Sequence, residues 1–383
     1  MNKLKTTYHK LKSHIIFMKI LMVSMPSLHF FRWTEQLKDA GHEIYWFNVT
    51  DSGEAVSRMD WIHQCYGWRL KWDFPGRTRL KSALPKLSKF IEKFNTNPTE
   101  KAFEDFLNTV KPDVVHSFAL HISCTPIISV MKKYNNLKWI YSSWGSDLYA
   151  RKIERNTSNL GSILKRVDLL FTDCFRDYEI AKEFGFQGSY LGVFPGGGGY
   201  DINFQEHMIS DKSNQIVVKG YENQHGKCIF ILEKLREIHK IRNYSIVVFG
   251  ANQKVIDYVK ENFDTSYNIK VYRHLKHSEL IKLFLASKIY IGYSLSDGTP
   301  NTLLEALLSG CIVLQSNPGN VTSEWVIENV NGFLLNKYNI ADQIEKALCF
   351  RIDDDFLSKF KQLNSKLNRT KVAMDVIKKY ESL

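Results

Sequence analysis

The sequence has no hydrophobic run of the roughly 20 residues that a membrane-spanning helix requires, and its six cysteines form no CxxC pair. The first absence argues against a polytopic membrane protein, and the second argues against a disulfide framework or a metal cluster. No GxGxxG motif opens either half of the chain, which disfavours a dehydrogenase. With 44% apolar and 24% charged residues among 383, the composition also excludes disorder, collagen and coiled coil.

Acidic residues are in the minority, because 40 Asp and Glu face 52 Lys and Arg, giving a net charge of +12. This charge favours anionic partners such as nucleic acid, acidic lipid or phosphorylated ligands, without choosing among them. Residues 69–93 hold eight basic residues against Asp73 and Glu92. Apolar residues recur there at near-helical spacing, which suits an interfacial helix on an anionic membrane. A solvated basic helix packed on the first sheet, with its aromatic residues in the core, explains the pattern equally well; Pro85 argues against one continuous helix.

Residues 1–17 are expected to form a basic extension ahead of the first strand. Lys19 interrupts the apolar stretch that follows, and no small-residue cleavage site comes after it, so a signal peptide is disfavoured. Cysteines in apolar runs, such as Cys311, are interpreted as small buried residues of a reduced protein. We therefore expect a cytoplasmic protein that is peripheral on the inner face of a membrane.

Short apolar runs alternate with amphipathic stretches in two series, one before and one after Pro195–Gly199. The expected strands are Ile20–Ser24, Glu43–Asn48, Asp113–His116, Trp139–Ser142, Leu169–Thr172 and Gly188–Gly192, then Gln215–Lys219, Ser245–Phe249, Ile269–Tyr272, Ile289–Tyr293, Cys311–Gln315 and Phe333–Leu334. This alternation predicts an α/β fold with parallel sheets covered on both faces. Two series joined by a glycine-rich hinge predict two Rossmann-like domains facing a central cleft, where the carboxyl ends of the strands would hold the active site.

The segment from Ser294 to Gly310 is the most informative part of the sequence. A strand leads into a polar loop, after which Thr299 is expected as the helix N-cap and Pro300 as the first helical residue. A helix that starts at the carboxyl end of a parallel strand presents free N–H groups and its positive dipole end to an anion. The segment therefore predicts an anion site.

Asn301, Thr302 and Glu305 share one face of this expected helix. A carboxylate one turn behind a bound phosphate can accept hydrogen bonds from a ribose diol, and Asp297 in the preceding loop can accept them from a sugar. A turn-forming Asp-Gly pair and a surface glutamate explain the same residues equally well.

The stretch from Asp297 to Glu305, with the later Asn317-Pro318-Gly319 and Glu324, resembles the nucleotide-sugar signature of retaining GT-B glycosyltransferases, family 4 (glycosyl transferases group 1). The resemblance extends from Met18 to about residue 350 and is strongest from 289 to 335. One departure is Asp297, which stands where the family usually has glutamate and is one methylene shorter.

The resemblance implies a GT-B fold and a division of the chain. Residues 18–195 would form an acceptor-binding domain and residues 196–355 a domain binding the nucleotide-sugar donor. Residues 356–383 would form a helix that crosses back onto the first domain.

The resemblance also implies roles for single residues. Lys219 and Lys227 would neutralise the donor diphosphate, Glu305 would bind the ribose, and the base would lie near the loops Phe249–Asn252 and Arg273–His277. The residues implied for catalysis are His116, Asp297 and Lys219; those implied for donor binding are Glu305, Lys227, Asn301, Thr302, Leu303, Gly298 and Pro300; those implied for the acceptor side are Asp147 and His29. From the residues alone, a lone histidine after an apolar strand is more often structural, an aspartate in a loop can be an N-cap, and the two lysines can be ordinary surface residues.

The implied activity is retaining transfer of a sugar from a nucleoside-diphosphate sugar, with UDP favoured over GDP, to a hydroxyl of a glycan or lipid-linked acceptor. Surface polysaccharide or glycoconjugate assembly is the implied setting, with no metal or other cofactor. A GT-B sugar-nucleotide epimerase and a non-catalytic nucleotide-sugar-binding subunit are the alternatives. Nucleic acid is not an expected partner, because no recognised nucleic-acid-binding module is present.

Overall fold

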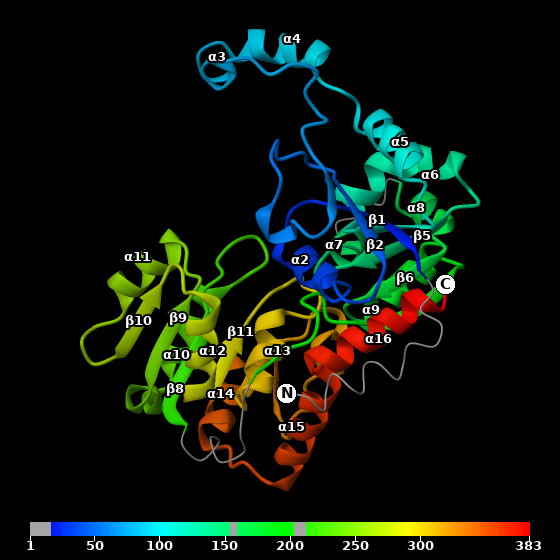
Figure 1. The fold of residues 1–383 in the computed structure, drawn as a ribbon. Helices are drawn as coiled ribbons and strands as arrows, with labels where there is room; N and C mark the ends of the chain where they lie inside the picture. The colour runs from blue at the N-terminus through cyan, green and yellow to red at the C-terminus, as the bar shows by residue number, and fades with distance from the viewer. Residues whose placement is uncertain (1–16, 154–158, 203–211) are drawn as a thin grey trace.

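The computed structural model describes residues 17–153, 159–202 and 212–383, which form two α/β domains (Figure 1). The first domain holds a seven-stranded sheet in the order β3-β2-β1-β4-β5-β6-β7, in which every described pair is parallel. Its strands are β1 (Lys19–Ser24), β2 (Glu43–Asn48), β3 (His63–Cys65), β4 (Val114–Phe118), β5 (Lys138–Ser143), β6 (Leu169–Thr172) and β7 (Ser189–Val193).

Helices cover both faces of this sheet, as its almost fully apolar strands require. The helices that pack on one face are α5 (Thr99–Val110), α6 (Ile128–Lys133), α8 (Leu160–Arg166) and α9 (Phe175–Glu183). The opposite face is covered by α2 (Leu28–Glu35), through Phe30 and Trp33, and by the C-terminal helix α16 (Arg369–Glu381), through Val376 and Tyr380. The short helix α7 (Tyr149–Ile153) follows β5.

The second domain holds a six-stranded parallel sheet in the order β10-β9-β8-β11-β12-β13. Its strands are β8 (Ser213–Lys219), β9 (Ser245–Phe249), β10 (Asn268–Tyr272), β11 (Ser287–Gly292), β12 (Ile312–Ser316) and β13 (Gly332–Leu335). Its helices are α10 (Cys228–Glu237), α11 (Gln253–Asn262), α12 (His277–Ala286), α13 (Asn301–Leu308), α14 (Ile340–Cys349) and α15 (Asp354–Leu367). The strand order reverses between β8 and β11, and such reversals are where doubly wound sheets bind ligands.

The predicted α/β class with two parallel sheets is confirmed, and each of the twelve predicted strands lies within two residues of an observed one. The edge strand β3 was not predicted, because it has three residues and no apolar run. Buried cysteines were also predicted correctly, because Cys124, Cys174, Cys228 and Cys311 are buried. The predicted basic extension lies outside the described residues, except for Phe17.

The chain returns from the second domain to the first at Asn368. Helix α15 packs on the second domain, where Phe356 and Leu363 are buried. Helix α16, which starts at Arg369, packs on the sheet of the first domain. The tail that crosses back therefore begins at Asn368, later than the expected residue 356.

The expected interfacial segment forms two helices, α3 (Arg77–Ala83) and α4 (Pro85–Asn95), separated at Leu84. Figure 1 shows this pair standing away from both sheets. Trp72, Phe90 and Phe94 are exposed. The alternative in which the aromatic residues sit in the core is therefore wrong for Trp72, whereas Trp68, just before the segment, packs against the core of the first domain. No helix among the described residues has the length and apolar character to cross a membrane.

Candidate active site

The loop between β11 and α13 lies at the strand-order reversal of the second sheet. Helix α13 starts at Asn301, with the extended residue Pro300 as its N-cap, so the expectation of Thr299 in that position is wrong. The Thr299 hydroxyl instead donates to the backbone oxygen of Asp173 in the first domain at 2.6 Å and accepts from Trp325 Nε1 at 3.0 Å. The first N–H groups of α13 have no intrahelical acceptor, which suits an anion.

Asp297 and Lys219 come together at this loop. Lys219 ends β8, and its Nζ lies 3.8 Å from Asp297 Oδ2. The following Gly298 is buried and touches the first domain, because a Cβ there would lie 2.3 Å from Asp173 Oδ2. Lys227 precedes α10, and its Nζ donates to the backbone oxygen of Asn223 at 2.8 Å. The side chain of Lys219 therefore reaches Asp297, whereas Lys227 contacts the loop through its backbone N–H, which donates to the Tyr293 oxygen at 3.2 Å.

Glu305 is 3% exposed and binds two basic side chains. His277 Nε2, at the start of α12, lies 2.7 Å from Glu305 Oε1, and Arg32 Nη1 of the first domain lies 3.8 Å from the same oxygen. Both contacts use Oε1, and within the described ranges Oε2 accepts no hydrogen bond from another side chain. The loop that ends at His277 was expected near the base, but its pairing with Glu305 was not predicted, because 28 residues separate the two side chains.

The first turn of α13 also reaches across the domain junction. Asn301 Oδ1 accepts from Tyr200 Oη at 2.7 Å, and its Nδ2 lies 3.3 Å from His29 Nδ1. The Thr302 hydroxyl lies 3.0 Å from Tyr290 Oη, and Leu303 is fully buried in the core beneath α13. His29 therefore lies beside the expected donor helix.

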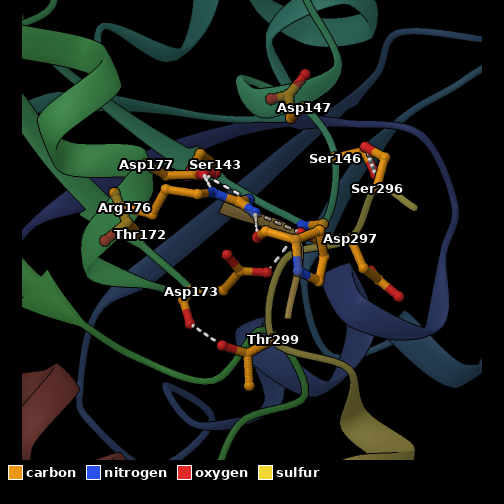
Figure 2. A network of polar contacts seen from close by, with 12 residues as sticks. Ser143, Ser146, Asp147, Thr172, Asp173, Arg176, Asp177, Ser296, Asp297 and Thr299 are labelled. Carbon is orange, nitrogen blue, oxygen red and sulfur yellow. Dashed lines mark hydrogen bonds and ion pairs between the residues drawn. The ribbon is translucent and has the colours of Figure 1, made fainter. Parts of the chain in front are cut away.

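Arg176 at the start of α9 is the centre of a polar network that the sequence analysis missed (Figure 2). Its Nε and Nη2 donate to Asp177 Oδ1 at 3.0 and 2.8 Å, while Nη1 donates to the backbone oxygens of Asp297 and Pro318 at 2.8 and 2.9 Å. The guanidinium also lies over the Tyr149 ring, 4.1 Å from its centre. Arg176 thus holds the Asp297 loop against the first domain.

Asp173, Cys174 and Asp177 form the one group of potential metal ligands among the described residues, with ligand atoms within 4.8 Å of one another. Asp177 is already bound by Arg176. Burial raises the pKa of the Cys174 thiol, whereas metal binding needs the thiolate. Burial and the charge of Asp177 also raise the pKa of Asp173 well above its usual range. The group therefore fits an ion-pair network better than a metal centre.

His116 lies inside the first domain, away from the junction. It is fully buried, with Nε2 at 2.8 Å from Ser142 Oγ and Nδ1 at 2.5 Å from Tyr380 Oη of α16. Burial lowers its pKa well below the usual range. Both ring nitrogens are engaged, so the structure contradicts the expectation that His116 faces the substrates and supports its structural alternative.

Asp147 follows β5, and its side chain binds the turn after β4. Its Oδ2 accepts from the backbone N–H of Leu120 at 2.6 Å and from Tyr141 Oη at 2.5 Å. Figure 2 shows its side chain apart from the Arg176 network. Nearby, Ser146 Oγ accepts from Ser296 Oγ at 3.0 Å, so this segment also touches the Asp297 loop.

A further link joins the domains at Glu324. Its carboxylate accepts from the backbone N–H groups of Phe175 at 2.9 Å and Arg176 at 3.4 Å, at the N-terminus of α9. Direct hydrogen bonds therefore cross the junction between the two domains.

Comparisons with known proteins agree with this geometry. Residues 200–364 match the family model described as Glycosyl transferases group 1. Sucrose-phosphate synthase from Thermosynechococcus elongatus has a similar structure, with a TM-score of 0.68 at 13% identity, covering 95% of this chain and 98% of that one. Anabaena HepE, solved in complex with UDP-glucose, gives a TM-score of 0.62 at 12% identity, covering 96% of this chain and 100% of that one.

A glycosyltransferase from Rickettsia africae also matches, with a TM-score of 0.64 at 13% identity over 95% of this chain and 98% of that one. No curated protein matches the chain in sequence. At such low identities the structural matches show the fold, and the family match adds the activity class for the domain that holds Lys219, Asp297 and Glu305. The chain therefore has the fold of the GT-B glycosyltransferases, and its residues 200–364 match the family described as Glycosyl transferases group 1.

Proposed function

We propose that the protein is a retaining glycosyltransferase that moves a sugar from a nucleoside-diphosphate sugar, with UDP preferred, to a hydroxyl of a glycan or lipid-linked acceptor. One observation carries the proposal. Lys219, Asp297 and the N-terminus of α13 converge where the strand order of the second sheet reverses. This is the position at which doubly wound sheets bind phosphorylated ligands.

The donor would bind mainly to the second domain. The diphosphate would accept hydrogen bonds from the first turn of α13 and from Lys219, while Glu305 Oε2 would accept them from the ribose hydroxyls. His277 would hold the Glu305 carboxylate in place from its Oε1 side. The neighbours support UDP, because Anabaena HepE was solved with UDP-glucose and the pneumococcal O-GlcNAc transferase GtfA with UDP and GlcNAc.

In the proposed reaction, the bond between the sugar C1 and the diphosphate oxygen breaks, and its electron pair leaves with the diphosphate. Lys219 and the α13 dipole stabilise this developing charge. The acceptor oxygen bonds to C1 on the same face, and its proton passes to the departing phosphate oxygen. We expect no added metal requirement, because these groups already supply positive charge.

Asp297 would accept hydrogen bonds from sugar hydroxyls, and the Arg176 bond to its backbone would fix the loop. Closed contacts between the domains would exclude water and limit hydrolysis of the donor. The acceptor would enter past Asp147 and His29 of the first domain. We place the enzyme at the cytoplasmic face of a membrane, in surface polysaccharide or glycoconjugate assembly.

Calorimetric titration of UDP, GDP and ADP tests the donor site in the wild type and in Glu305→Ala. The matched control is Glu345→Ala, which removes an exposed glutamate of α14 in the same domain. We expect micromolar UDP binding that Glu305→Ala weakens about tenfold or more and Glu345→Ala leaves unchanged, because a lost charged hydrogen bond costs about 1.5–3 kcal/mol.

Three outcomes contradict the proposal in different ways. A folded wild type that binds none of the nucleotides overturns the donor site. Release of an epimerised sugar nucleotide without any acceptor identifies an epimerase. Donor binding without turnover on glycan and lipid-linked acceptors identifies a non-catalytic subunit.

A further inference from the structure

The segment 69–95, termed here the basic hairpin, projects from the first domain on a well-defined base. Asn95 binds the backbone of Trp72 through both its side-chain oxygen and nitrogen, at 2.9 and 2.7 Å. Asp51 accepts from the backbone N–H groups of Gly67 and Arg69, each at 2.6 Å. Just before the hairpin, Trp68 stacks on Phe47 of β2, with ring centres 5.0 Å apart. The base is therefore anchored to the sheet, while α3 and α4 extend beyond it (Figure 1).

The outer part of the hairpin exposes large apolar side chains. Leu84 is 53% exposed, Leu87 46%, Phe90 62% and Phe94 56%. Leu87, Phe90 and Phe94 are three and four residues apart, so they lie along one face of α4. Isolated exposed apolar residues are common, but a contiguous stripe of this kind marks a surface that binds something.

Basic side chains border this stripe. Lys86, Lys89 and Lys93 each stand one residue before a member of the stripe and are exposed. Within the part of the chain that the structure describes, none of the three has an ion-pair partner, whereas Lys81 pairs with Glu92. The hairpin contains eight basic and two acidic residues, a net charge of +6 that is half of the charge of the whole chain.

We propose that the basic hairpin docks on an anionic lipid bilayer, with the α4 stripe inserted among the lipids and the lysines against their headgroups. An apolar stripe bordered by lysines is the arrangement that interfacial helices use. Nucleic acid would match the charge, but the leucines Leu84 and Leu87 offer no aromatic face for base stacking. A bilayer matches both the charge and the aliphatic face.

Docking would also orient the proposed active site. The hairpin follows β3, and in a parallel sheet all carboxyl strand ends lie at one edge. That edge includes the end of β1, after which α2 carries His29 and Arg32 to the domain junction. A lipid-linked acceptor held in the same bilayer would therefore meet the side of the first domain that faces the donor.

Co-sedimentation of the full chain with vesicles tests this inference separately from the donor site, because the hairpin shares no residue with it. The vesicles are phosphatidylcholine alone or phosphatidylcholine with 30% phosphatidylglycerol, a mixture chosen as about one anionic lipid in three. The charge variant is Lys86→Gln/Lys89→Gln/Lys93→Gln and the apolar variant is Leu87→Ser/Phe90→Ser. The matched control, Lys254→Gln/Lys260→Gln/Lys346→Gln, removes three exposed lysines from α11 and α14 of the second domain.

We expect binding to anionic vesicles that falls with added salt and is at least about tenfold weaker in the charge and apolar variants, while the control binds like wild type. UDP affinity should be the same in all four proteins, which also verifies that they are folded. Equal vesicle binding by the charge variant and the control would overturn the proposal. Binding of single-stranded RNA without vesicle binding would overturn it in favour of a nucleic-acid partner.

Discussion

At the scale of single residues, Asp147 shows how burial links a carboxyl group to pH. Burial raises its pKa to about 6, although the hydrogen bonds from Tyr141 and the Leu120 backbone favour the charged form and oppose this rise. In an unfolded chain an aspartate has a pKa of about 3.9. The folded protein therefore binds the Asp147 proton more tightly than the unfolded chain does.

We expect the unfolding free energy of Asp147→Asn to rise relative to wild type between pH 4 and pH 7. Because the folded pKa is raised, the stability from this proton is fully present below about pH 4 and is lost as pH rises through about 6. Asparagine does not titrate, so the difference between the two proteins should change by up to about 3 kcal/mol. Denaturant unfolding of both proteins at four pH values measures this difference in unfolding free energy. A difference that is constant with pH would contradict the raised pKa of Asp147.

At the scale of elements, the glycine run Gly196–Gly199 after β7 is closely packed against other segments of the chain. A Cβ on Gly199 would lie 2.3 Å from the Arg369 Cα, where α16 begins, and Tyr200 exchanges backbone hydrogen bonds with Leu367 and Arg369. A Cβ on Gly197 would lie 2.9 Å from the side chain of Asn301. The run thus fits between the returning C-terminal helix and the proposed donor helix.

Gly199→Ala and Gly197→Ala should therefore have different effects on stability and on UDP binding. At Gly199 the obstacle is backbone, which cannot turn away, so we expect a loss of about 1–3 kcal/mol of unfolding free energy. At Gly197 the obstacle is the end of a side chain, so stability should change little while UDP binding weakens through the displaced Asn301. Thermal unfolding measures the stability of both variants, and calorimetry measures their UDP affinity. Equal losses of stability would refute this distinction between backbone and side-chain contact.

The strands and helices were predicted from sequence better than the long-range contacts between their side chains. Strands buried on both faces appear as apolar runs, which is why the two sheets could be outlined, whereas β3 has no such run. The α13 segment was found because its proline, glycine and acidic residues are local in sequence. Arg176 was missed because it meets Asp297 from 121 positions away. His116 was misassigned because α16 covers its face of the sheet from the other end of the chain, which no strand pattern reveals.

At the scale of the whole molecule, two kinds of link hold the domains together. Helix α16 is joined to the second domain through the chain itself and packs on the first domain. Glu324 of the second domain meets the N-terminus of α9 through hydrogen bonds, which would break if the domains separated. A carboxylate at a helix N-terminus is also favoured by the helix dipole. Glu324 is therefore suited to set how often the junction opens.

We expect Glu324→Ala to shift the nucleotide-free protein toward open arrangements. Losing a carboxylate that accepts two backbone N–H groups at a helix end should cost about 1–3 kcal/mol, which changes the balance of open and closed forms about 5- to 150-fold. Small-angle scattering should show a larger radius of gyration than in wild type, and UDP should reduce it if the donor bridges the domains. The Glu345→Ala control should scatter like wild type. A Glu324→Ala protein with an unchanged radius of gyration would mean that the other junction contacts suffice, and that Glu324 acts only by ordering the start of α9.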